Sequence, residues 1–389
     1  MKKIFLAVFL SIFSITGFSQ KLSENASISL ITIAPGNDLY SVFGHTAIRV
    51  QDSVLQIDKA YNYGTFDFDD PNFYVKFVKG DLNYMISDGN FQYFLQYYIS
   101  ENRSVTEQKL NLSQLQKQQL FDFLEWNLLP ENKFYLYDFF FQNCATVVRD
   151  VFEKQLSGSI SFHAEDKNYT FRNMLHQYLG EDKEWNKLGI DLILGARADK
   201  IATPREYMFL PDYLMYATQT ARLKTDSATF DFAQKSETLF QSQKQEISSQ
   251  LPKPVTVFWL FFAGYVLVTI WGFVKKKRLY GFDFVWLLGA GIGGFILFFA
   301  WFFTNHTITV NNYNLIWLLV THFVFAFFLF GKKKSGFYKG YLLINGSLNV
   351  LLLLLWFVIP QELNSWIIPL VLTFAQRFFY LYFFDKIKL

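Results

Sequence analysis

Five long apolar segments fill the C-terminal part of the chain and constrain its fold more than any other feature. We predict membrane spans at residues 255–274, 282–304, 313–331, 339–359 and 364–384. Each is close to the roughly 20 residues that an α-helix needs to cross the hydrocarbon core of a bilayer. Because soluble proteins rarely bury so many apolar helices in series, the sequence predicts an all-α bundle of five transmembrane helices over residues 255–389.

Basic residues mark one face of this predicted bundle. Clusters of Lys and Arg follow the first, third and fifth spans, at residues 275–278, 332–334 and 386–388. The two other loops, residues 305–312 and 360–364, carry no Lys or Arg. The positive-inside rule makes the basic face cytoplasmic. The sequence therefore predicts a multi-pass protein of the inner (cytoplasmic) membrane, with its N-terminal part in the periplasm.

The N-terminus independently predicts export. Lys2 and Lys3 precede an apolar stretch at residues 4–13, and small residues precede a predicted cut before Gln20 or Lys21. This pattern is typical of a signal peptide, here residues 1–19, although an uncleaved anchor is the alternative. We expect an exported domain over residues 20–221 and a polar helical stalk or linker over residues 222–254.

The exported segment alternates between two kinds of pattern. Strands are predicted at residues 28–33, 43–51, 60–68 and 104–112, and helices at residues 91–98, 113–128 and 145–155. Early strands followed by mixed helices indicate an α+β domain. The formal net charge of +3 gives no reason to expect a nucleic-acid partner, and the chain has no paired-cysteine metal motif.

Cys144 is the only cysteine among the 389 residues. An exported thiol without a disulfide partner in its own chain is either buried or used. His45, in the segment FGHTAIRV, opens a predicted strand and is the candidate activator, because an adjacent imidazole gives a thiol thiolate character. The alternative is that Cys144 is a small buried hydrophobe and His45 a structural histidine.

The position of Cys144 before a predicted helix suits catalysis. Its sulfur would face the positive end of the helix dipole, and nearby backbone N–H groups would hold a developing oxyanion. A histidine on a strand and a cysteine at a helix start are typical of papain-like thiol enzymes. Since His45 precedes Cys144 here, the sequence indicates a circularly permuted arrangement.

A third residue is needed to orient His45. Asn62, Tyr63 and Asp67 lie on the adjacent predicted strand. Asn62 resembles the neutral orienting residue of papain-like sites and Asp67 the charged variety, and we favour Asn62 or Tyr63. Asn143 and Asp138 are near Cys144 in sequence and are candidates for shaping the oxyanion site.

Other polar and aromatic residues have two interpretations. Arg149, Arg197 and Arg205 bind a phosphate or form structural ion pairs, of which we favour the ion pairs. Residues 72–98 mix aromatics with lysines and either dock on lipid headgroups or form a packed core face. Intramembrane His322 and Arg377 are functional candidates by default. Hydrogen bonding between helices is at least as good an explanation for them.

Several segments of the chain resemble the family of Lnb-type lipoprotein N-acyltransferases: FGHTAIRV, AYNYGTFDF, PENKFYLYDFFFQNCATVVRD and MFLPDYLM. The resemblance implies a permuted papain-like exported domain joined to a helical membrane domain. It also implies transfer of an acyl chain from a phospholipid to the α-amino group of a diacylglyceryl-cysteine lipoprotein. Phospholipids and lipoprotein N-termini would be the partners, with Cys144 and His45 as the catalytic pair. A thioester acylates an amine without ATP or a metal, so no cofactor is expected.

Two other functions remain open at the level of the sequence. One is a membrane-anchored papain-like cysteine peptidase or amidase of the cell envelope. The other is a non-catalytic envelope scaffold. The predicted membrane half favours the acyltransferase over the peptidase, because both of its substrates are lipids. The combination of the Cys144 and His45 motifs favours an enzyme over a scaffold.

Overall fold

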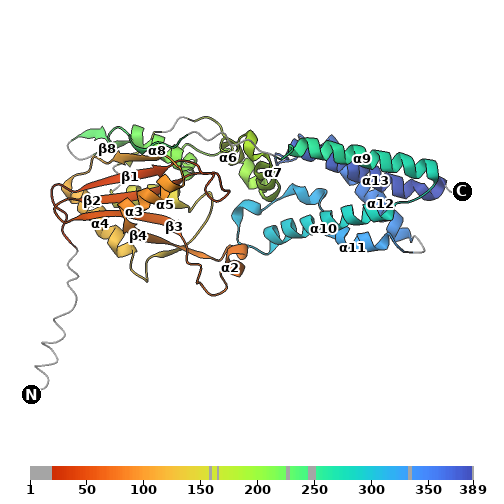
Figure 1. The fold of residues 1–389 in the computed structure, drawn as a ribbon, viewed down its shortest axis with the longest axis horizontal. Helices are drawn as coiled ribbons and strands as arrows, with labels where there is room; N and C mark the ends of the chain where they lie inside the picture. The colour runs from red at the N-terminus through yellow and green to blue at the C-terminus, as the bar shows by residue number, and fades with distance from the viewer. Residues whose placement is uncertain are drawn as a thin grey trace, which may run out of the picture.

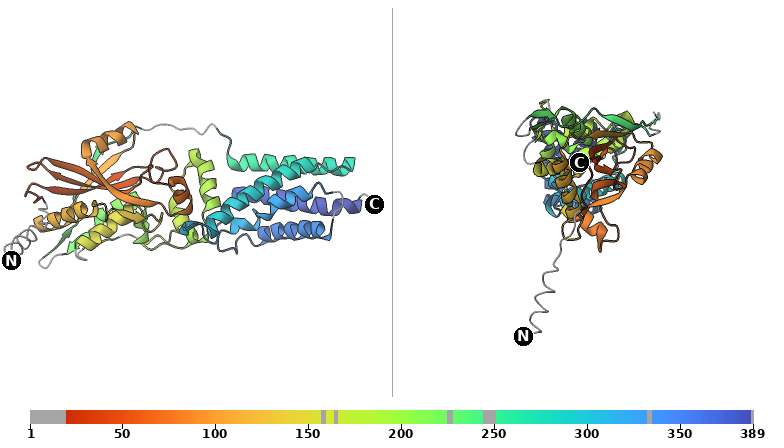
Figure 2. Two further views of the ribbon diagram at one scale, coloured as in Figure 1. Left: turned by 90° about the horizontal axis from the view of Figure 1, so that it is seen from below. Right: turned by 90° about the vertical axis from the view of Figure 1, so that its left-hand side faces the viewer.

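The structure, a computed structural model, has a sheet-rich N-terminal unit and a helical C-terminal unit arranged end to end (Figures 1 and 2). It describes residues 20–156, 160–163, 166–224, 228–243, 251–331 and 335–387. The predicted signal peptide, residues 1–19, lies outside this part of the chain. The order of the two units confirms the coarse prediction of a sheet-containing domain followed by a helical one. The papain-like relationship stays a prediction.

An antiparallel sheet of seven strands organises the exported unit, in the order β10-β5-β1-β2-β3-β4-β6. Its strands are β1 (Ser27–Ile33), β2 (His45–Asp52), β3 (Ile57–Thr65), β4 (Asn83–Asn90), β5 (Val105–Lys109), β6 (Phe134–Leu136) and β10 (Glu237–Phe240). The expected strands at residues 28–33, 43–51 and 60–68 correspond to β1, β2 and β3. These three strands pair as neighbours.

Helices cover both faces of this sheet because apolar side chains alternate along its strands. One face packs on α4 (Gln114–Asn127), α5 (Cys144–Gln155) and α8 (Pro211–Thr220), and its core includes Ile48, Val50, Tyr61 and Tyr63. The other face packs on α3 (Phe91–Ser100), and its core includes Ile33, Ala47 and Ala60. Smaller elements of this unit are α2 (Phe73–Lys79), β7 (Ile160–Ser161), α6 (Phe171–His176), α7 (Glu184–Ile193), β8 (Arg222–Lys224) and β9 (Thr229–Asp231).

Reciprocal capping fixes the start of two helices on the first face. Ser113 caps α4, as predicted, and its partner in the capping box is Gln116. Asn143 caps α5 in the same way with Thr146. Such a box satisfies two backbone N–H groups that a helix start leaves free. The capping of α5 therefore fixes its first residue, Cys144.

The predicted helical stalk over residues 222–254 is wrong where the structure describes it. This segment forms β8, β9 and β10 instead, and α9 begins only at Pro254. Phe232 is fully buried in the core of the exported unit, and β10 pairs with β5 at the sheet edge. The free N–H and C=O groups of β5 at the sheet edge favour pairing with another strand, and apolar residues such as Phe232 anchor the segment in the core. The prediction of a helix relied on the high content of Gln and Lys, which does not reveal either feature.

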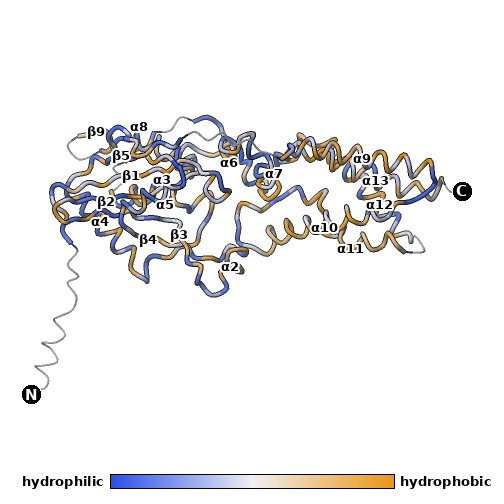
Figure 3. The backbone as a smooth tube through the Cα atoms, in the orientation of Figure 1, coloured by the Kyte–Doolittle hydropathy of each residue, from blue (hydrophilic) through white to orange (hydrophobic). Residues whose placement is uncertain are grey.

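Four helices of the described chain are long and apolar enough to cross a membrane. They are α9 (Pro254–Lys275), α10 (Tyr280–Phe302), α12 (Gly336–Leu354) and α13 (Ile368–Ile387). Orange, which marks hydrophobic residues, is frequent along them in Figure 3 and alternates with paler stretches. They correspond to four of the five predicted spans, and a multi-pass protein is thereby supported.

The predicted span over residues 313–331 is not one continuous helix. It consists of a 3-10 turn, Tyr313–Ile316, followed by the short helix α11 (Thr321–Phe328). His322 bonds the carbonyl oxygen of Trp317 at 3.2 Å and the hydroxyl of Tyr341 at 2.7 Å. A break in a helix at membrane depth requires such partners for its freed carbonyl groups.

Polar side chains in the bundle pair with one another between helices. Arg377 of α13 forms two 2.7 Å hydrogen bonds to the carboxylate of Asp283 in α10, and a third 2.7 Å bond to Thr269 in α9. All three side chains are buried. The interpretation of His322 and Arg377 as helix-to-helix contacts therefore accounts for their positions.

The exported unit contacts the outer ends of the membrane helices at backbone level. The N–H of Gly195 donates to Ile308 and that of Ala196 to Asn311, at 2.9 and 3.0 Å. A Cβ atom on Gly195 would lie 1.9 Å from the carbonyl oxygen of Val310. The two predicted loops without basic residues, 305–312 and 360–364, both take part in this contact.

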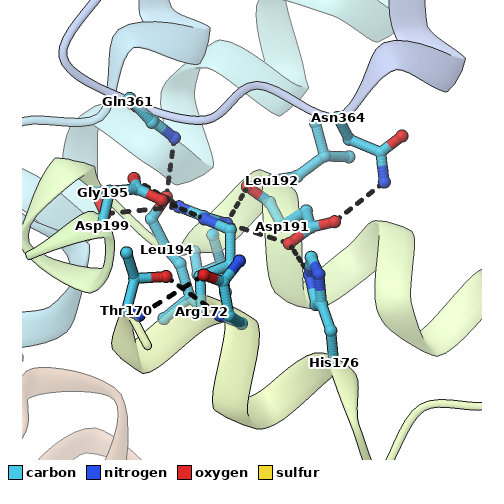
Figure 4. A network of polar contacts seen from close by, with 12 residues as sticks. Thr170, Arg172, His176, Asp191, Leu192, Leu194, Gly195, Asp199, Gln361 and Asn364 are labelled. Carbon is cyan, nitrogen blue, oxygen red and sulfur yellow. Dashed lines mark hydrogen bonds and ion pairs between the residues drawn. The ribbon is translucent and has the colours of Figure 1, made fainter. Parts of the chain in front are cut away.

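A buried arginine organises the same contact from the exported side (Figure 4). Arg172 of α6 pairs with Asp191 at 2.9 Å and with Asp199 at 2.7 Å, and its side chain is fully buried. Asp191 in turn accepts from Asn364 of the membrane unit at 2.8 Å. Gln361 donates to the carbonyl oxygen of Leu194 at 2.8 Å. The cluster thus orients the groups that bind loop 360–364.

Replacing Arg172 tests this cluster. Arg172→Met removes the guanidinium between two largely buried carboxylates and leaves Asp191 only His176 as a basic partner. Breaking a buried ion pair in this way typically costs about 3–5 kcal/mol of stability. We expect a clear drop in the thermal unfolding midpoint of the detergent-solubilised protein. The matched control is Arg222→Met, which removes an exposed ion pair with Asp231 and has little effect. An equal drop in the unfolding midpoint for both variants would contradict the proposed contribution of the Arg172 cluster to stability.

Candidate active site

A cavity of ≈570 Å³ lies where the exported unit meets the membrane unit. Cys144 and His45 both line it, so the structure brings the two predicted catalytic residues to one space. Its walls are rich in aromatic residues, which include Phe43, Phe66, Phe77, Tyr84, Tyr97, Tyr98, Tyr137, Phe139 and Phe209. Residues 305–308 of the membrane unit form part of the wall. Neither unit alone makes this cavity.

Backbone N–H groups surround the sulfur of Cys144. The residue is the first of α5 and is half-buried. The N–H groups of Thr46, Ala145 and Cys144 itself interact with the thiol and favour its ionised form. Thr46 follows His45 at the start of β2, so the sheet and the helix start converge on one atom. This arrangement provides preorganised donors where negative charge would develop.

His45 is held by Asn62. The Nε2 atom of His45 lies 3.1 Å from Oδ1 of Asn62 on β3. Because an amide oxygen only accepts, Nε2 carries the proton in this contact and Nδ1 keeps its lone pair. The ring of Tyr98 stacks on the imidazole, with 6.3 Å between ring centroids. The structure therefore supports Asn62 as the residue that orients His45.

A backbone glycine permits the position of His45. Gly44 has φ +82°, a conformation that residues with a side chain rarely adopt. A Cβ atom there would lie 2.8 Å from the carbonyl oxygen of Ile33. A side chain at position 44 would therefore displace the start of β2, where His45 lies.

The structure separates Tyr63 and Asp67 from His45. Neighbouring residues of a strand point to opposite faces, so Asn62 and Tyr63 cannot both reach the imidazole. The Tyr63 hydroxyl donates to Asn127 at 2.7 Å, within the core on the α5 side. Asp67 is exposed and accepts from the N–H of Asp69 at 2.9 Å. Neither side chain occupies the orienting position proposed for it.

Asn143 and Asp138 shape the site through the backbone. The Oδ1 atom of Asn143 caps α5, and its amide nitrogen donates to the carbonyl oxygens of Phe139 and Phe209, each at 2.8 Å. These four hydrogen bonds occupy the side chain, so Asn143 positions Cys144 and has no free donor for an oxyanion. Asp138 accepts from two backbone N–H groups and from Thr307 of the membrane unit, at 2.5 Å.

Burial keeps the pair neutral at rest. It raises the pKa of the Cys144 thiol to about 11, against the opposing pull of the backbone N–H groups. Burial also lowers the pKa of His45 to about 4, while the hydrogen bond that His45 donates to Asn62 acts in the other direction. The resting site thus differs from the expected thiolate, because desolvation disfavours both charged forms. Proton transfer must accompany attack by the sulfur.

Sequence reasoning missed Arg103, which also lines the cavity. Arg103 follows α3 and belongs to no recognisable sequence motif. It comes near Cys144 and His45 only in the folded chain. Two of the three arginines considered from the sequence form the favoured ion pairs: Arg149 binds Asp150, and Arg205 binds Asp150 and Glu153. Arg197 lies over the ring of Phe141.

The helix α2 forms the membrane-side rim of the cavity. Its Phe77 lines the cavity, and His306 of the membrane unit bonds the carbonyl oxygen of Phe77 at 3.1 Å. Tyr74, Val75 and Val78 on the same helix are exposed. In contrast, Phe91 and Tyr98 of α3 are buried. The interpretation of residues 72–98 as a packed core face thus fits α3, whereas α2 exposes apolar side chains, for which contact with lipid headgroups stays a prediction.

Comparison with known families places both units. The family model described as the Lnb N-terminal periplasmic domain matches residues 19–177. The model described as the Lnb transmembrane domain matches residues 245–388. No curated protein and no solved structure matched the chain. Among the described residues, no group of three or more His, Cys, Asp or Glu could hold a metal ion.

The protonation state of the site predicts how Cys144 reacts with an alkylating reagent. A thiol with a pKa of about 11 has only about one part in 10⁴ of thiolate at pH 7. The alkylation rate is expected to rise about tenfold per pH unit between pH 7 and 10, because the thiolate is the nucleophile. Intact-mass spectrometry measures this rate on the single cysteine. A rate plateau around neutral pH would instead indicate a preformed thiolate–imidazolium pair.

Proposed function

We propose that this chain, which belongs to the Lnb family of membrane proteins with a periplasmic domain, is a lipoprotein N-acyltransferase. It would move an acyl chain from a phospholipid, through a Cys144 thioester, to the α-amino group of a diacylglyceryl-cysteine lipoprotein. One observation carries the proposal. The Cys144, His45 and Asn62 arrangement opens into an aromatic cavity whose wall includes residues of the membrane unit.

In the first step, Nδ1 of His45 takes the thiol proton as the Cys144 sulfur attacks the ester carbonyl carbon. The tetrahedral oxyanion is held by backbone N–H groups at the start of α5 and β2. When the ester C–O bond breaks, His45 returns the proton to the leaving oxygen. The products are a lysophospholipid and an acyl thioester on Cys144.

In the second step, the amino group of the lipoprotein attacks the thioester carbonyl. His45 accepts a proton from the amine, and the C–S bond breaks. The sulfur regains this proton as the amide forms. Throughout, Asn62 keeps Nδ1 of His45 free to act as the base by accepting a hydrogen bond from the Nε2–H group.

The setting of the cavity supports lipid substrates. Aromatic walls suit acyl chains, and the exposed apolar side chains of α2 suit contact with the outer leaflet of the cytoplasmic membrane. A strand histidine, its Asn62 partner and a cysteine at a helix start also fit a permuted papain-like domain. A peptidase of soluble substrates needs no cavity wall from a membrane unit.

Substitution of the three residues tests the chemistry. We expect Cys144→Ser to abolish acyl transfer and His45→Ala to lower kcat by roughly 10²–10⁴-fold, since His45 moves the proton in both steps. Asn62→Ala is expected to lower activity less. The imidazole of His45 remains as the base in this variant and loses only the hydrogen bond that orients it. Mass spectrometry of the purified protein with phospholipid measures the acyl thioester, and acylation of a lipopeptide measures turnover.

The matched control is His163→Ala, which removes an exposed histidine far from the cavity lining. We expect this variant to retain full activity. Full activity of Cys144→Ser, with the protein folded and inserted, would refute an enzyme that uses this thiol.

The substrate assignment is tested in cells. Deletion of the gene is expected to leave lipoproteins with a free α-amino group, and mass spectrometry of their N-terminal peptides detects the loss of the amide-linked chain. Restoration by the wild type but not by Cys144→Ser ties the change to this site. Unchanged N-termini in the deletion strain, with thioester formation intact, would favour the cysteine peptidase or amidase.

A further inference from the structure

A single permanent positive charge, Arg103, lines the Cys144 cavity among the lining residues that the structure describes. Its side chain is only 6% exposed. The guanidinium lies over the ring of Tyr98, 5.0 Å from the centroid, and Tyr98 stacks on His45. Arg103 is also close enough to His45 and Cys144 to act on the charge of both. The cation therefore belongs to the same space as the catalytic pair.

The hydrogen bonds of this guanidinium are incomplete. Its Nε–H donates to the carbonyl oxygen of Ala34 at 2.9 Å, and Nη1 lies 3.6 Å from a carboxylate oxygen of Glu101. The Nη2 atom is buried and has no partner. Buried donors without partners are unfavourable, and arginine presents a planar fork that matches phosphate oxygens. The N–H groups of Nη2 therefore have unused capacity to donate hydrogen bonds at the wall of the cavity.

Other groups in the cavity do not compete for this cation. Asp138 is the one carboxylate among the described lining residues, and its oxygens accept from Phe140, Phe141 and Thr307. Residues 305–308 of the wall follow the end of α10 at Phe302 within a few residues. This places the cavity where a membrane helix leaves the hydrocarbon, which is the level of lipid phosphates.

We propose that Arg103 forms an anion subsite that binds the phosphate of a membrane lipid beside Cys144. The bound phosphate fixes the headgroup, so that an ester of the same lipid reaches the sulfur. The assignment of a lipid as the carrier of the phosphate rests on the proposed function. The subsite itself rests on the Nη2 atom of Arg103, which is buried beside the cavity and has no hydrogen-bond partner.

Protection of Cys144 from alkylation tests the subsite without acyl transfer. The full-length protein, in an uncharged detergent at pH 9, is treated with iodoacetamide while an amphiphile is titrated in. Since Cys144 is the only cysteine, the intact mass reports this site alone. Dodecyl phosphate is expected to protect at concentrations roughly 10- to 100-fold lower than uncharged 1-O-dodecylglycerol, an ether that has no acyl group to transfer, through charge-assisted hydrogen bonds. Equal protection by the two amphiphiles would overturn the proposal, and this comparison requires no variant.

Variants assign the selectivity to the residue. In Arg103→Gln the preference for dodecyl phosphate is expected to disappear, and Arg103→Lys, which keeps the charge and loses the fork, retains part of it. Arg205→Gln is the matched control, because Arg205 is half exposed and lies outside the cavity lining. An unchanged preference in Arg103→Gln would overturn the proposal. So would a changed basal alkylation rate with unchanged preference, which would assign Arg103 to the thiol.

Two further measurements are needed. The first distinguishes a lipid phosphate from free phosphate, and the second distinguishes the anion subsite from the proposed acyltransferase function. Inorganic phosphate alone is expected to give no protection at the concentrations where dodecyl phosphate acts. Full protection by inorganic phosphate would make this a site for the free ion and overturn the lipid assignment. If dodecyl phosphate protects but phospholipids form no thioester, the acyl-transfer function fails while the anion subsite stands.

Discussion

The contact between the exported unit and the outer ends of the membrane helices is the constraint on which the rest of the structure depends. It is made by backbone groups at Gly195 and Val310, which approach too closely for any side chain at position 195. In the exported unit, Arg172 pairs with Asp191, and Asp191 accepts a hydrogen bond from Asn364 in loop 360–364 of the membrane unit. Because the cavity wall includes residues 305–308, this contact also places Cys144 beside the membrane unit.

Partial burial of Cys144 and His45 determines the charge of the pair. Desolvation disfavours the thiolate of Cys144 and the imidazolium of His45 together, so both groups rest neutral. Backbone N–H groups then have the larger role, because they are fixed before charge forms and need no reorganisation. The rigid cap from Asn143 is what keeps them in place.

Local patterns in the sequence predicted the two elements that carry the candidate catalytic residues, the strand at His45 and the helix at Cys144. Alternation identified the strand after His45, and the aromatic-to-helical change identified the helix at Cys144. Asn62 and Tyr63 were indistinguishable until the register of β3 showed which of them faces α3. Arg103 was invisible, because its partners Ala34 and Tyr98 meet it only in the folded chain. The continuous span over residues 313–331 failed for a similar reason: composition does not reveal that His322 stabilises a break.

The edge strand β10 has a consequence for how the protein is made. It supplies the last strand of the sheet from residues that lie only a short distance before α9. During translocation, β5 keeps an open edge of unpaired N–H and C=O groups until the chain has emerged almost to its first membrane helix. Completion of the sheet and insertion of the bundle are therefore coupled in time. A chain that stops before β10 would leave β5 as an unpaired edge strand. Such an edge can pair with other chains, so truncated products are expected to aggregate.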